Sequence, residues 1–238
     1  MNLVSFRISL VEVSKLLTDI GFFRMKGIKS INDDGVSAEF KNVCQQLDYL
    51  KIYKVAVQNF DFDLLLFDES FFQFSLTVIN DLVEVRYAFF QNPITYKSYE
   101  EYIEILREDG IISDETDEEI GDAFFEDYQQ FISEQQINVA STTIRYDVDY
   151  NNYKPLVHSL SHIHIGNYNH IRIPCNKFIT PLKFVLFILK HVYYKQWKNF
   201  IEGENAIISK ALLEAKEKCS TIEEVYWTDL EKLEMFLS

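Results

Sequence analysis

Alternation of apolar and polar residues marks several stretches of the chain as β-strands. In residues 72–78, apolar side chains occupy every second position, and residues 83–89 and 142–150 repeat this period of two. A short apolar run at 62–67 predicts a further strand. Because successive side chains of a strand point to opposite faces, each strand has one apolar face. The set therefore predicts a largely antiparallel sheet with one covered face.

A histidine-rich hairpin is predicted from residues 161–165 and 169–174. A three-residue loop places Ile165 opposite Ile171, and this register puts all four isoleucines of the two strands on one face. The other face then gathers the polar side chains of the hairpin: His162, His164, His170 and Arg172. We therefore expect a sheet surface that carries three imidazoles and one guanidinium.

Helices are predicted where apolar residues recur every three or four positions, which occurs over residues 7–20, 41–50, 97–109, 117–135, 180–200, 205–218 and 221–236. Thr180 is a good N-cap and Pro181 fits the first helical position, so the apolar helix after the hairpin has a defined start. Residues 23–40 predict a further short hairpin, with its turn at 32–35.

Together these elements predict an α+β fold: a largely antiparallel sheet with helices packed on it, an acidic helical arm and C-terminal helices. We expect a single domain over residues 1–238. Within it, residues 97–135 form an acidic helical insertion, and residues 139–201 form the His-rich hairpin and a buried helix.

The net charge of −14 is concentrated in one segment. Residues 100–134 contain fourteen acids and one base, whereas residues 139–218 contain eleven bases and six acids. Carboxylates are rarely buried without partners, so we expect the acidic helices to be largely exposed. Such a segment can form a solvated face, bind a basic protein partner or shield the basic region.

Several classes of protein do not fit the sequence. There is no signal-peptide pattern, and the longest apolar run of the strongest helix, Phe184–Leu189, is too short for a bilayer, so no membrane association is expected. Three widely separated cysteines suit a reducing cytoplasm. The chain lacks a phosphate-binding glycine loop, a dinucleotide fingerprint and a nucleophile elbow. These absences argue against ATPases, Rossmann oxidoreductases and serine hydrolases, and they leave any cofactor unidentified.

A family resemblance rests mainly on the C-terminal half. The residues that carry it are Ile144-Arg145-Tyr146-Asp147-Val148-Asp149, His158, Ser161-His162, Ile165-Gly166, Ile171-Arg172-Ile173-Pro174, Pro181 and the apolar run Phe184–Tyr194. With them, most of the chain resembles a bacterial family of uncharacterised proteins, domain of unknown function 2290. The family pattern has His-Pro at His158-Ser159 and often Cys at Ile171, and it lacks His164 and His170. The resemblance implies a grouping but no assigned activity.

Three interpretations of the histidine-rich region remain open. The first is a metal site, in which His162 and His164 form a ligand pair and Asp147 and Asp149 complete it from a neighbouring strand. This interpretation requires the two strands to be adjacent.

The second interpretation is metal-free acid–base chemistry on a phosphodiester. His158 and His162 would serve as base and acid, while Arg172 or Arg145 would neutralise the phosphate. The third is a hydrogen-bonded polar cluster without catalytic activity, in which Arg145 or Arg172 pairs with Asp147 or Asp149. The candidate catalytic residues are His158, His162, Arg172, Arg145 and Asp147.

Two hypotheses about function follow, and whether the protein is an enzyme is left open between them. In the first, the protein acts on RNA or nucleotides through the His/Arg site, within a bacterial defence or toxin–antitoxin system, by analogy with other small proteins that lack a metabolic motif. In the second, it is a non-catalytic subunit that binds a protein partner through its acidic helices and an aromatic surface.

Overall fold

The structure, a computed structural model, describes residues 2–29, 35–94, 99–112, 120, 123–134, 141–166, 171–202 and 206–238. The chain divides into two compact units. The first combines Met1–Gln91 with Thr142–Ser238, and the second is Asn92–Ser141.

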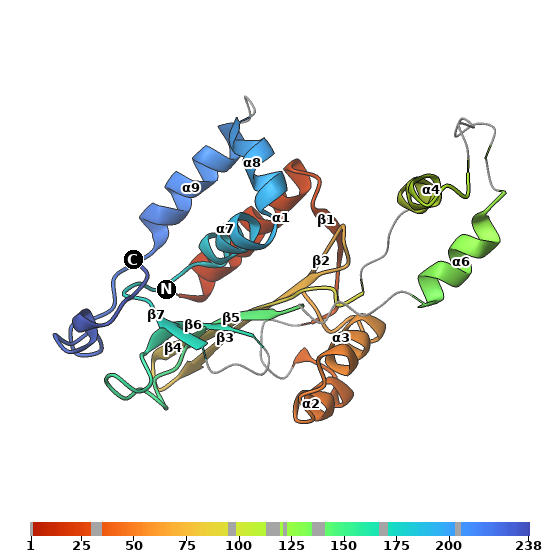
Figure 1. Cartoon of the computed structure of the whole chain (residues 1–238). Coiled ribbons are helices and arrows are strands. Elements are labelled where there is room, and N and C mark those ends of the chain that lie inside the picture. The colour runs from red at the N-terminus through yellow and green to blue at the C-terminus, as the bar shows by residue number, and fades with distance from the viewer. Residues whose placement is uncertain are drawn as a thin grey trace. The chain divides into compact units, whose positions relative to one another are not determined.

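An antiparallel sheet forms the centre of the first unit (Figure 1). Among the described residues it has seven strands, which lie side by side in chain order: β1 (Phe23–Lys26), β2 (Leu64–Leu66), β3 (Phe71–Ile79), β4 (Leu82–Phe90), β5 (Thr143–Val148), β6 (Ser161–Ile165) and β7 (Ile171–Pro174). Every neighbouring pair is antiparallel. With helices packed on the sheet, the predicted α+β fold is confirmed.

The turn between β3 and β4 sets the register of the longest strand pair. Asn80 and Asp81 both have positive φ angles, 50° and 64°, as a two-residue hairpin turn with the twist of the sheet requires. The register places Phe74 opposite Tyr87 and continues unbroken to Phe71. Phe74 and Leu76 of β3 therefore share one face of the sheet with Val85 and Tyr87 of β4.

The prediction of a local hairpin over residues 23–40 is wrong. β1 pairs with β2, so that Phe23 lies opposite Leu66, and the chain forms a helix from Ala38. Residues 32–34 of the expected turn lie outside the described residues. The distant β2 consists of three buried leucines and offers β1 an apolar partner, whereas the residues after the expected turn enter α2, which the Ser37 side chain caps.

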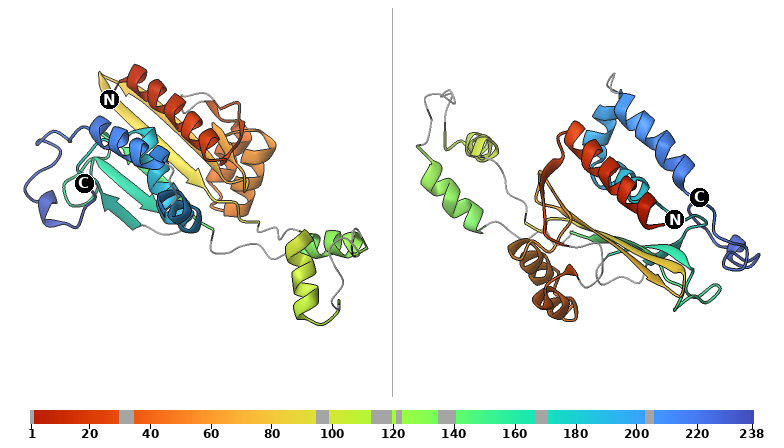
Figure 2. Two further views of the ribbon diagram at one scale, coloured as in Figure 1. Left: turned by 90° about the horizontal axis from the view of Figure 1, so that it is seen from above. Right: turned by 180° about the vertical axis from the view of Figure 1, so that it is seen from behind.

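Four helices pack on one face of the sheet (Figures 1 and 2): α1 (Leu3–Asp19), α7 (Pro181–Val192), α8 (Tyr194–Glu202) and α9 (Ala206–Lys218). The core between them and the sheet includes the fully buried Phe74, Tyr87, Tyr146 and Phe184. The N-cap prediction for α7 is confirmed, because the Thr180 hydroxyl accepts the Lys183 N–H at 3.2 Å. Every helix among the described residues is too short or too polar to span a bilayer.

The helix predicted over residues 180–200 is interrupted at Tyr193, which separates α7 from α8. The Tyr193 ring packs against Phe22 and Phe89, and its hydroxyl donates to Asp68 Oδ2 at 2.8 Å. These contacts with distant parts of the chain hold Tyr193 outside helical geometry, which helical periodicity alone does not indicate.

Helices α2 (Ala38–Cys44) and α3 (Tyr49–Gln58) cover part of the opposite face of the sheet. Their apolar side chains pack against Phe71, Ala88 and Phe90, which alternate with the residues of the larger core. The single helix predicted at 41–50 is therefore two, and the Asp48 side chain caps α3 by accepting the Lys51 N–H.

The segment after α9 is not the helix predicted over 221–236. It contains a short 3-10 turn, Glu231–Leu233, and then returns to the outer edge of β7. There the Leu237 N–H donates to the Pro174 carbonyl at 2.9 Å, and the Asn176 N–H donates to the Leu237 carbonyl at 3.1 Å. Backbone bonds to the sheet edge thus replace those of a helix.

The second unit contains α4 (Tyr99–Glu108) and α6 (Phe125–Glu134), which confirms helices in both predicted acidic stretches. Residues 113–119 lie outside the described part of the chain. The unit has an apolar cluster of its own, formed by Tyr102, Ile103, Leu106, Ile112 and Ile120. The acids of α4 and α6 are therefore carried on a scaffold with a small core.

Replacing residues 92–141 by a two-residue Asn-Gly turn is expected to leave the first unit folded. β4 and β5 are antiparallel neighbours with Phe90 opposite Thr143, and the Gln91 N–H donates to the Thr142 carbonyl at 3.3 Å. The excised segment thus begins and ends at adjacent backbone positions, which a tight turn can join without moving either strand. Calorimetry should show one cooperative unfolding transition.

The matched control is Asp81→Gly, which introduces the same Asn-Gly turn at the existing β3–β4 connection. Both proteins should unfold cooperatively. Loss of the transition in the excised protein alone would show that the sheet depends on the helical unit.

Candidate functional site

The candidate site lies on the face of β5 that points away from α1 and α7. Ile144, Tyr146 and Val148 are buried in the core beneath these helices, so the alternating Arg145 and Asp147 project from the other face. Strand pairing places polar side chains from four strands in two rows. One row contains Arg86, Asp147 and His162, and the other contains Arg145, His164 and Arg172.

The predicted register of the His-rich hairpin is confirmed. Ile165 lies opposite Ile171 and Ile163 lies opposite Ile173. His162 lies on the predicted polar face of the hairpin, but it is covered there, since only 1% of this residue is exposed. His170 and the loop at 167–169 lie outside the described residues.

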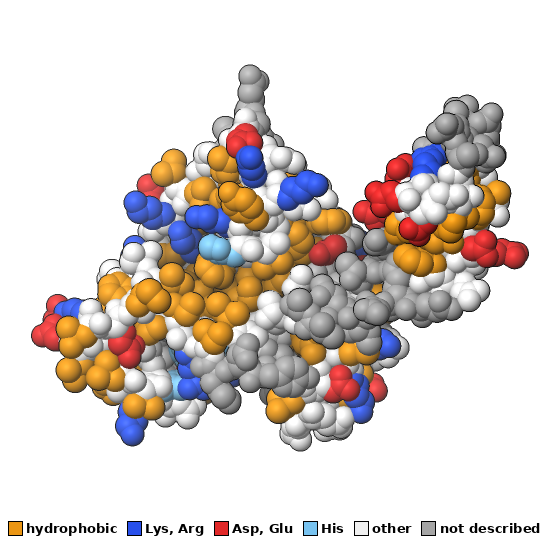
Figure 3. All heavy atoms as spheres, viewed as in Figure 1, with side chains coloured by type: hydrophobic (Ala, Val, Ile, Leu, Met, Phe, Trp, Pro, Cys, Tyr) orange, Lys and Arg blue, Asp and Glu red, His pale blue; other side chains and the backbone are white. Residues whose placement is uncertain are grey.

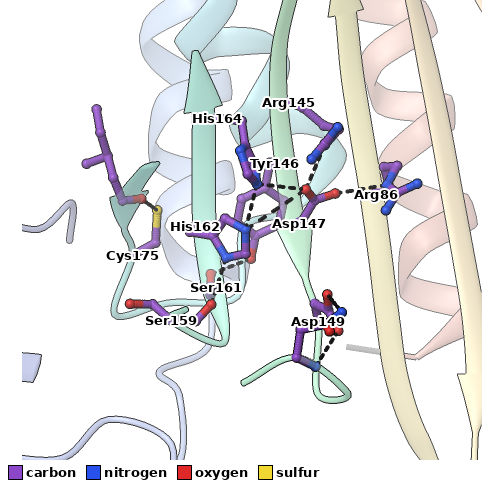
Figure 4. Close-up of polar contacts among 12 residues, drawn as sticks. Arg86, Arg145, Tyr146, Asp147, Asp149, Ser159, Ser161, His162, His164 and Cys175 are labelled. Carbon is purple, nitrogen blue, oxygen red and sulfur yellow. Dashed lines mark hydrogen bonds and ion pairs between the residues drawn. The ribbon is translucent and has the colours of Figure 1, made fainter. Parts of the chain in front are cut away.

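Asp147 is the centre of the polar cluster (Figure 4). Its Oδ2 accepts from Arg145 Nε at 2.6 Å, and its Oδ1 accepts from Arg86 Nε at 3.0 Å. His164 Nε2 lies 3.3 Å from Oδ2, and His162 Nε2 lies 4.0 Å from the same oxygen. The Asp147 carboxylate is buried, whereas both arginines reach solvent. One carboxylate thus fixes three strands of the sheet through their side chains.

The hydrogen bonds determine which ring nitrogens of His162 and His164 donate. His162 Nδ1 lies 2.7 Å from the Ser159 carbonyl oxygen, which can only accept, so Nδ1 carries the proton and Nε2 of the neutral ring is an acceptor. His164 Nε2 lies 2.8 Å from that acceptor and also faces Asp147, so it is the donor. In the neutral tautomer of His164 that this hydrogen bond selects, the lone pair is on Nδ1.

The environment shifts the acidity of Asp147 and His162 in ways that favour this arrangement. Burial alone would raise the pKa of Asp147, but the His164 hydrogen bond and the charges of Arg145 and Arg86 outweigh it and hold that pKa well below its usual range. Burial, and then the neighbouring His164, lowers the pKa of His162 to about 4. At neutral pH, Asp147 is therefore ionised and His162 is neutral.

The low pKa of His162 corrects one expected role. In the second interpretation His162 is a candidate for either base or acid, but a buried imidazole with a pKa of about 4 is not an imidazolium at neutral pH and so cannot serve as the general acid. It accepts a hydrogen bond from His164 instead, and His164 is the more exposed of the two rings.

The remaining predicted residues lie at the border of the cluster. Arg172 is exposed and lies opposite His164, and among the described residues no carboxylate lies within ion-pair distance of its guanidinium. The alternative pairing of Arg172 with Asp147 or Asp149 is therefore not formed. The His158 ring packs on His162 with a centroid distance of 4.7 Å, and its buried Nδ1 has no hydrogen-bond partner among the described residues.

Asp147, His162 and His164 could also hold a metal ion, since β5 and β6 are adjacent and their ligand atoms lie within 4.8 Å of one another. His162 Nε2 and His164 Nε2 are 2.8 Å apart, and they lie 4.0 and 3.3 Å from Asp147 Oδ2. In a tetrahedral zinc site with bonds of about 2.0–2.1 Å, two ligand atoms are about 3.3 Å apart, which falls within this range of separations. However, two guanidinium groups already pair with Asp147 and would repel a cation.

Asp149, the second carboxylate of the expected metal set, does not join these ligands. Its oxygens accept from the backbone and side-chain amides of Asn152 at 3.0 and 2.7 Å, which stabilises the turn after β5. Asp149 instead lines a polar pocket of about 210 Å³ together with Ser75, Arg86, Asp147 and Asn151. This pocket gives solvent access to the Arg86 side of the cluster.

Two residues of the cluster were absent from the predicted catalytic set. Arg86 alternates with Val85 and Tyr87 on β4, so its outward direction was readable from sequence, but its pairing with β5 across a fifty-residue insertion was not. His164 was recognised on the polar face of the hairpin, but it was not among the candidate catalytic residues.

The comparisons with known proteins supply a family but no chemistry. A family model described as "Uncharacterized conserved protein (DUF2290)" matches residues 23–232. No curated protein and no solved structure matches the chain. The resemblance to domain of unknown function 2290 is thereby confirmed as to the family, and the function has to be argued from the site.

Lowering the pH from about 6.5 to about 4 is expected to destabilise the protein through His162. The folded pKa of about 4 lies below the ordinary value of about 6.5, so the unfolded chain binds a proton that the folded chain does not. Stability that is fully present above pH 6.5 is lost across this window, by roughly 3 kcal/mol. Urea unfolding at a series of pH values measures the slope.

His162→Asn should flatten this slope, because an Asn amide can still donate to the Ser159 carbonyl but does not titrate. The control is His191→Asn, at an exposed position on α7, which should change the slope less. An unchanged slope in His162→Asn would contradict the prediction.

Proposed function

We propose a function for this chain, which belongs to the family described as Uncharacterized conserved protein (DUF2290), from the geometry of its site. The proposal is that it binds and cleaves a phosphodiester of RNA or of a nucleotide at the row formed by Arg145, His164 and Arg172. The observation that carries it is the placement of His164. Its Nε2 is held by Asp147 and His162, and guanidinium groups flank it on both neighbouring strands.

The charge of the cluster favours an anionic ligand. Arg86 and Arg145 pair with the single buried carboxylate of Asp147, and Arg172 lies opposite His164, so the group retains net positive charge when both histidines are neutral. Guanidinium groups match phosphate oxygens in pairs of parallel hydrogen bonds. A phosphate over the His164 row would therefore bring its reacting atoms next to His164 Nδ1.

His164 is the group that would move the proton. For RNA, Nδ1 would accept the proton of a 2′-hydroxyl while the oxygen attacks phosphorus, and the imidazolium would then return a proton to the departing 5′-oxygen. The products would be a cyclic phosphate and a free 5′-hydroxyl. Arg145 and Arg172 would stabilise the charge of the phosphorane, Asp147 would stabilise the imidazolium, and His162 would be a positioning residue.

We place this activity in the bacterial cytoplasm, within a defence or toxin–antitoxin system. The support is an analogy with small bacterial proteins that carry no metabolic motif, together with the RNA-directed chemistry proposed for the site.

His164→Ala is expected to reduce cleavage of a single-stranded RNA oligonucleotide by about 100-fold or more, the usual contribution of a positioned acid–base group. Arg172→Gln should mainly raise KM, because it removes a phosphate contact from an exposed position. The Arg172→Gln thermal midpoint should stay near the wild-type value, whereas His164→Ala leaves the buried His162 Nε2 without its donor and should lower the midpoint moderately while the protein stays folded. The assay is gel or fluorescence detection of oligonucleotide cleavage.

Arg24→Gln is the matched control, because Arg24 pairs with Glu69 at the β1 edge, far along the sheet from β6. Cleavage should also persist in a chelator. Chelator-sensitive cleavage would support the metal interpretation against this one. Full activity of His164→Ala, or a purified protein that cleaves no RNA or nucleotide, would leave the cluster with only a structural role.

We also propose a second function, which the acidic unit supports: binding of a basic protein partner. The second unit has its own apolar cluster, so the carboxylates of α4 and α6 are displayed from a folded scaffold. On α6, Phe125 is 42% exposed beside Glu126 and Asp127. An exposed aromatic ring bordered by carboxylates suits a partner surface that combines apolar and cationic side chains.

Reversing the charge of this surface with Glu126→Lys and Asp127→Lys is expected to abolish partner binding while the RNA-cleaving site is unaffected. Affinity purification from the native host, followed by mass spectrometry, identifies partners that the wild type retains and the variant loses. Glu214→Lys on α9 of the first unit is the control. Equal recovery of every partner by both proteins would contradict the second function.

A further inference from the structure

A second pocket lies on the opposite side of β6 from the polar cluster. It has a volume of about 310 Å³ and is enclosed by α7, the start of α8, α9 and the residues that follow β7. Ile163 contributes to its floor, whereas His162 and His164 of the same strand project from the other face. The pocket is thus separate from the proposed phosphodiester site.

The inner surface of this pocket is apolar. Phe184, Phe187, Trp197 and Leu212 contribute to it, and Phe187 and Leu212 are only half-buried although the surrounding core is closed. In Figure 3, hydrophobic side chains spread across this side of the first unit. The volume is at the lower end of the range for small-molecule pockets, about 300–1,000 Å³.

The rim of the pocket is basic. Four lysines and a histidine line it: Lys177, Lys183, Lys190, Lys216 and His191. Figure 3 shows Lys or Arg and His side chains along one border of the apolar surface. In the described part of the chain, no acidic side chain lies within 4.0 Å of any of these four ammonium groups. The lysines of α8 and α9 that are ion-paired, such as Lys198 and Lys210, do not line the pocket.

We propose that this pocket binds a small amphipathic anion that is free in solution, with a single apolar chain and a carboxylate or phosphate head. The chain would lie against Phe184, Phe187 and Leu212, and the head would be held by lysines of the rim. A volume of 310 Å³ accommodates roughly ten groups of the size of water, about 30 Å³ each, which suits a medium-length chain.

The chemistry of the pocket supports reversible binding. Cys175 is buried in the pocket lining, and this burial raises the pKa of its thiol to about 12, so it is not a nucleophile at neutral pH. Cys219, directly after α9, donates its thiol hydrogen to the carbonyl of Ala215 in α9. Affinity would therefore come from apolar contact and from charge-assisted hydrogen bonds to the rim.

The test is calorimetric titration of the full-length protein with decanoate and with decyl phosphate. Decanol, which lacks the charge, and acetate, which lacks the chain, should each bind at least about tenfold more weakly, as loss of a charge-assisted contact or of apolar burial predicts. The variant Lys183→Gln/Lys190→Gln should lose affinity for decanoate by a similar factor. Vesicles of an anionic lipid should not sediment the protein.

The control variant is Lys195→Gln/Lys198→Gln, which removes two exposed lysines of α8 that do not line the pocket. It should bind decanoate like the wild type, with the same thermal midpoint. If both double variants lost the same affinity for decanoate, the lysines would act only by non-specific charge attraction, and the proposed site would be overturned. Absence of decanoate and decyl phosphate binding, or a preference for vesicles, would also overturn it, and neither result depends on RNA cleavage.

Discussion

The register of β5 between β4 and β6 determines both faces of the first unit. In this register Tyr146 is fully buried beneath the helices, and Asp147 meets Arg86 and the histidines on the other face. A slip by one residue would place the charges of Arg145 and Asp147 in the apolar core, which is among the costliest changes a sheet can suffer. The apolar core therefore enforces the arrangement of the polar cluster.

Much of this fold could be predicted because apolar and polar residues alternate along its strands, and because strands that follow one another in the chain pair with each other. The isoleucines of β6 and β7 define their register without reference to the rest of the molecule. The failures have a common origin in distant contacts. β1 finds its partner in β2, Tyr193 is held by Phe22 and Asp68, and Leu237 bonds to β7. None of these contacts leaves a periodic signal in the sequence.

The sequence predicted most residues of the candidate site, but it did not predict the chemical role of each residue. Alternation placed His162 and Arg172 on one face of the hairpin and Asp147 on the polar face of its own strand. The structure shows that these strands are adjacent, adds Arg86 and gives His164 the central position. Burial explains why the two histidines have different proposed roles. The ring of His162 is enclosed, with Ser159 and His158 against it, whereas His164 is more exposed. A two-residue spacing cannot reveal which ring is covered, because the covering groups come from the chain before β6.

The bonds between Leu237 and β7 also bear on the solubility of the folded protein. An open sheet has two edges, and the unpaired N–H and C=O groups of an edge strand are a template on which another chain can add a strand. Here Pro174 offers no N–H, and the Leu237 backbone occupies its carbonyl. The last residues of the sequence thus protect the β7 edge, and their local detachment would open a route to intermolecular β-pairing before the core unfolds.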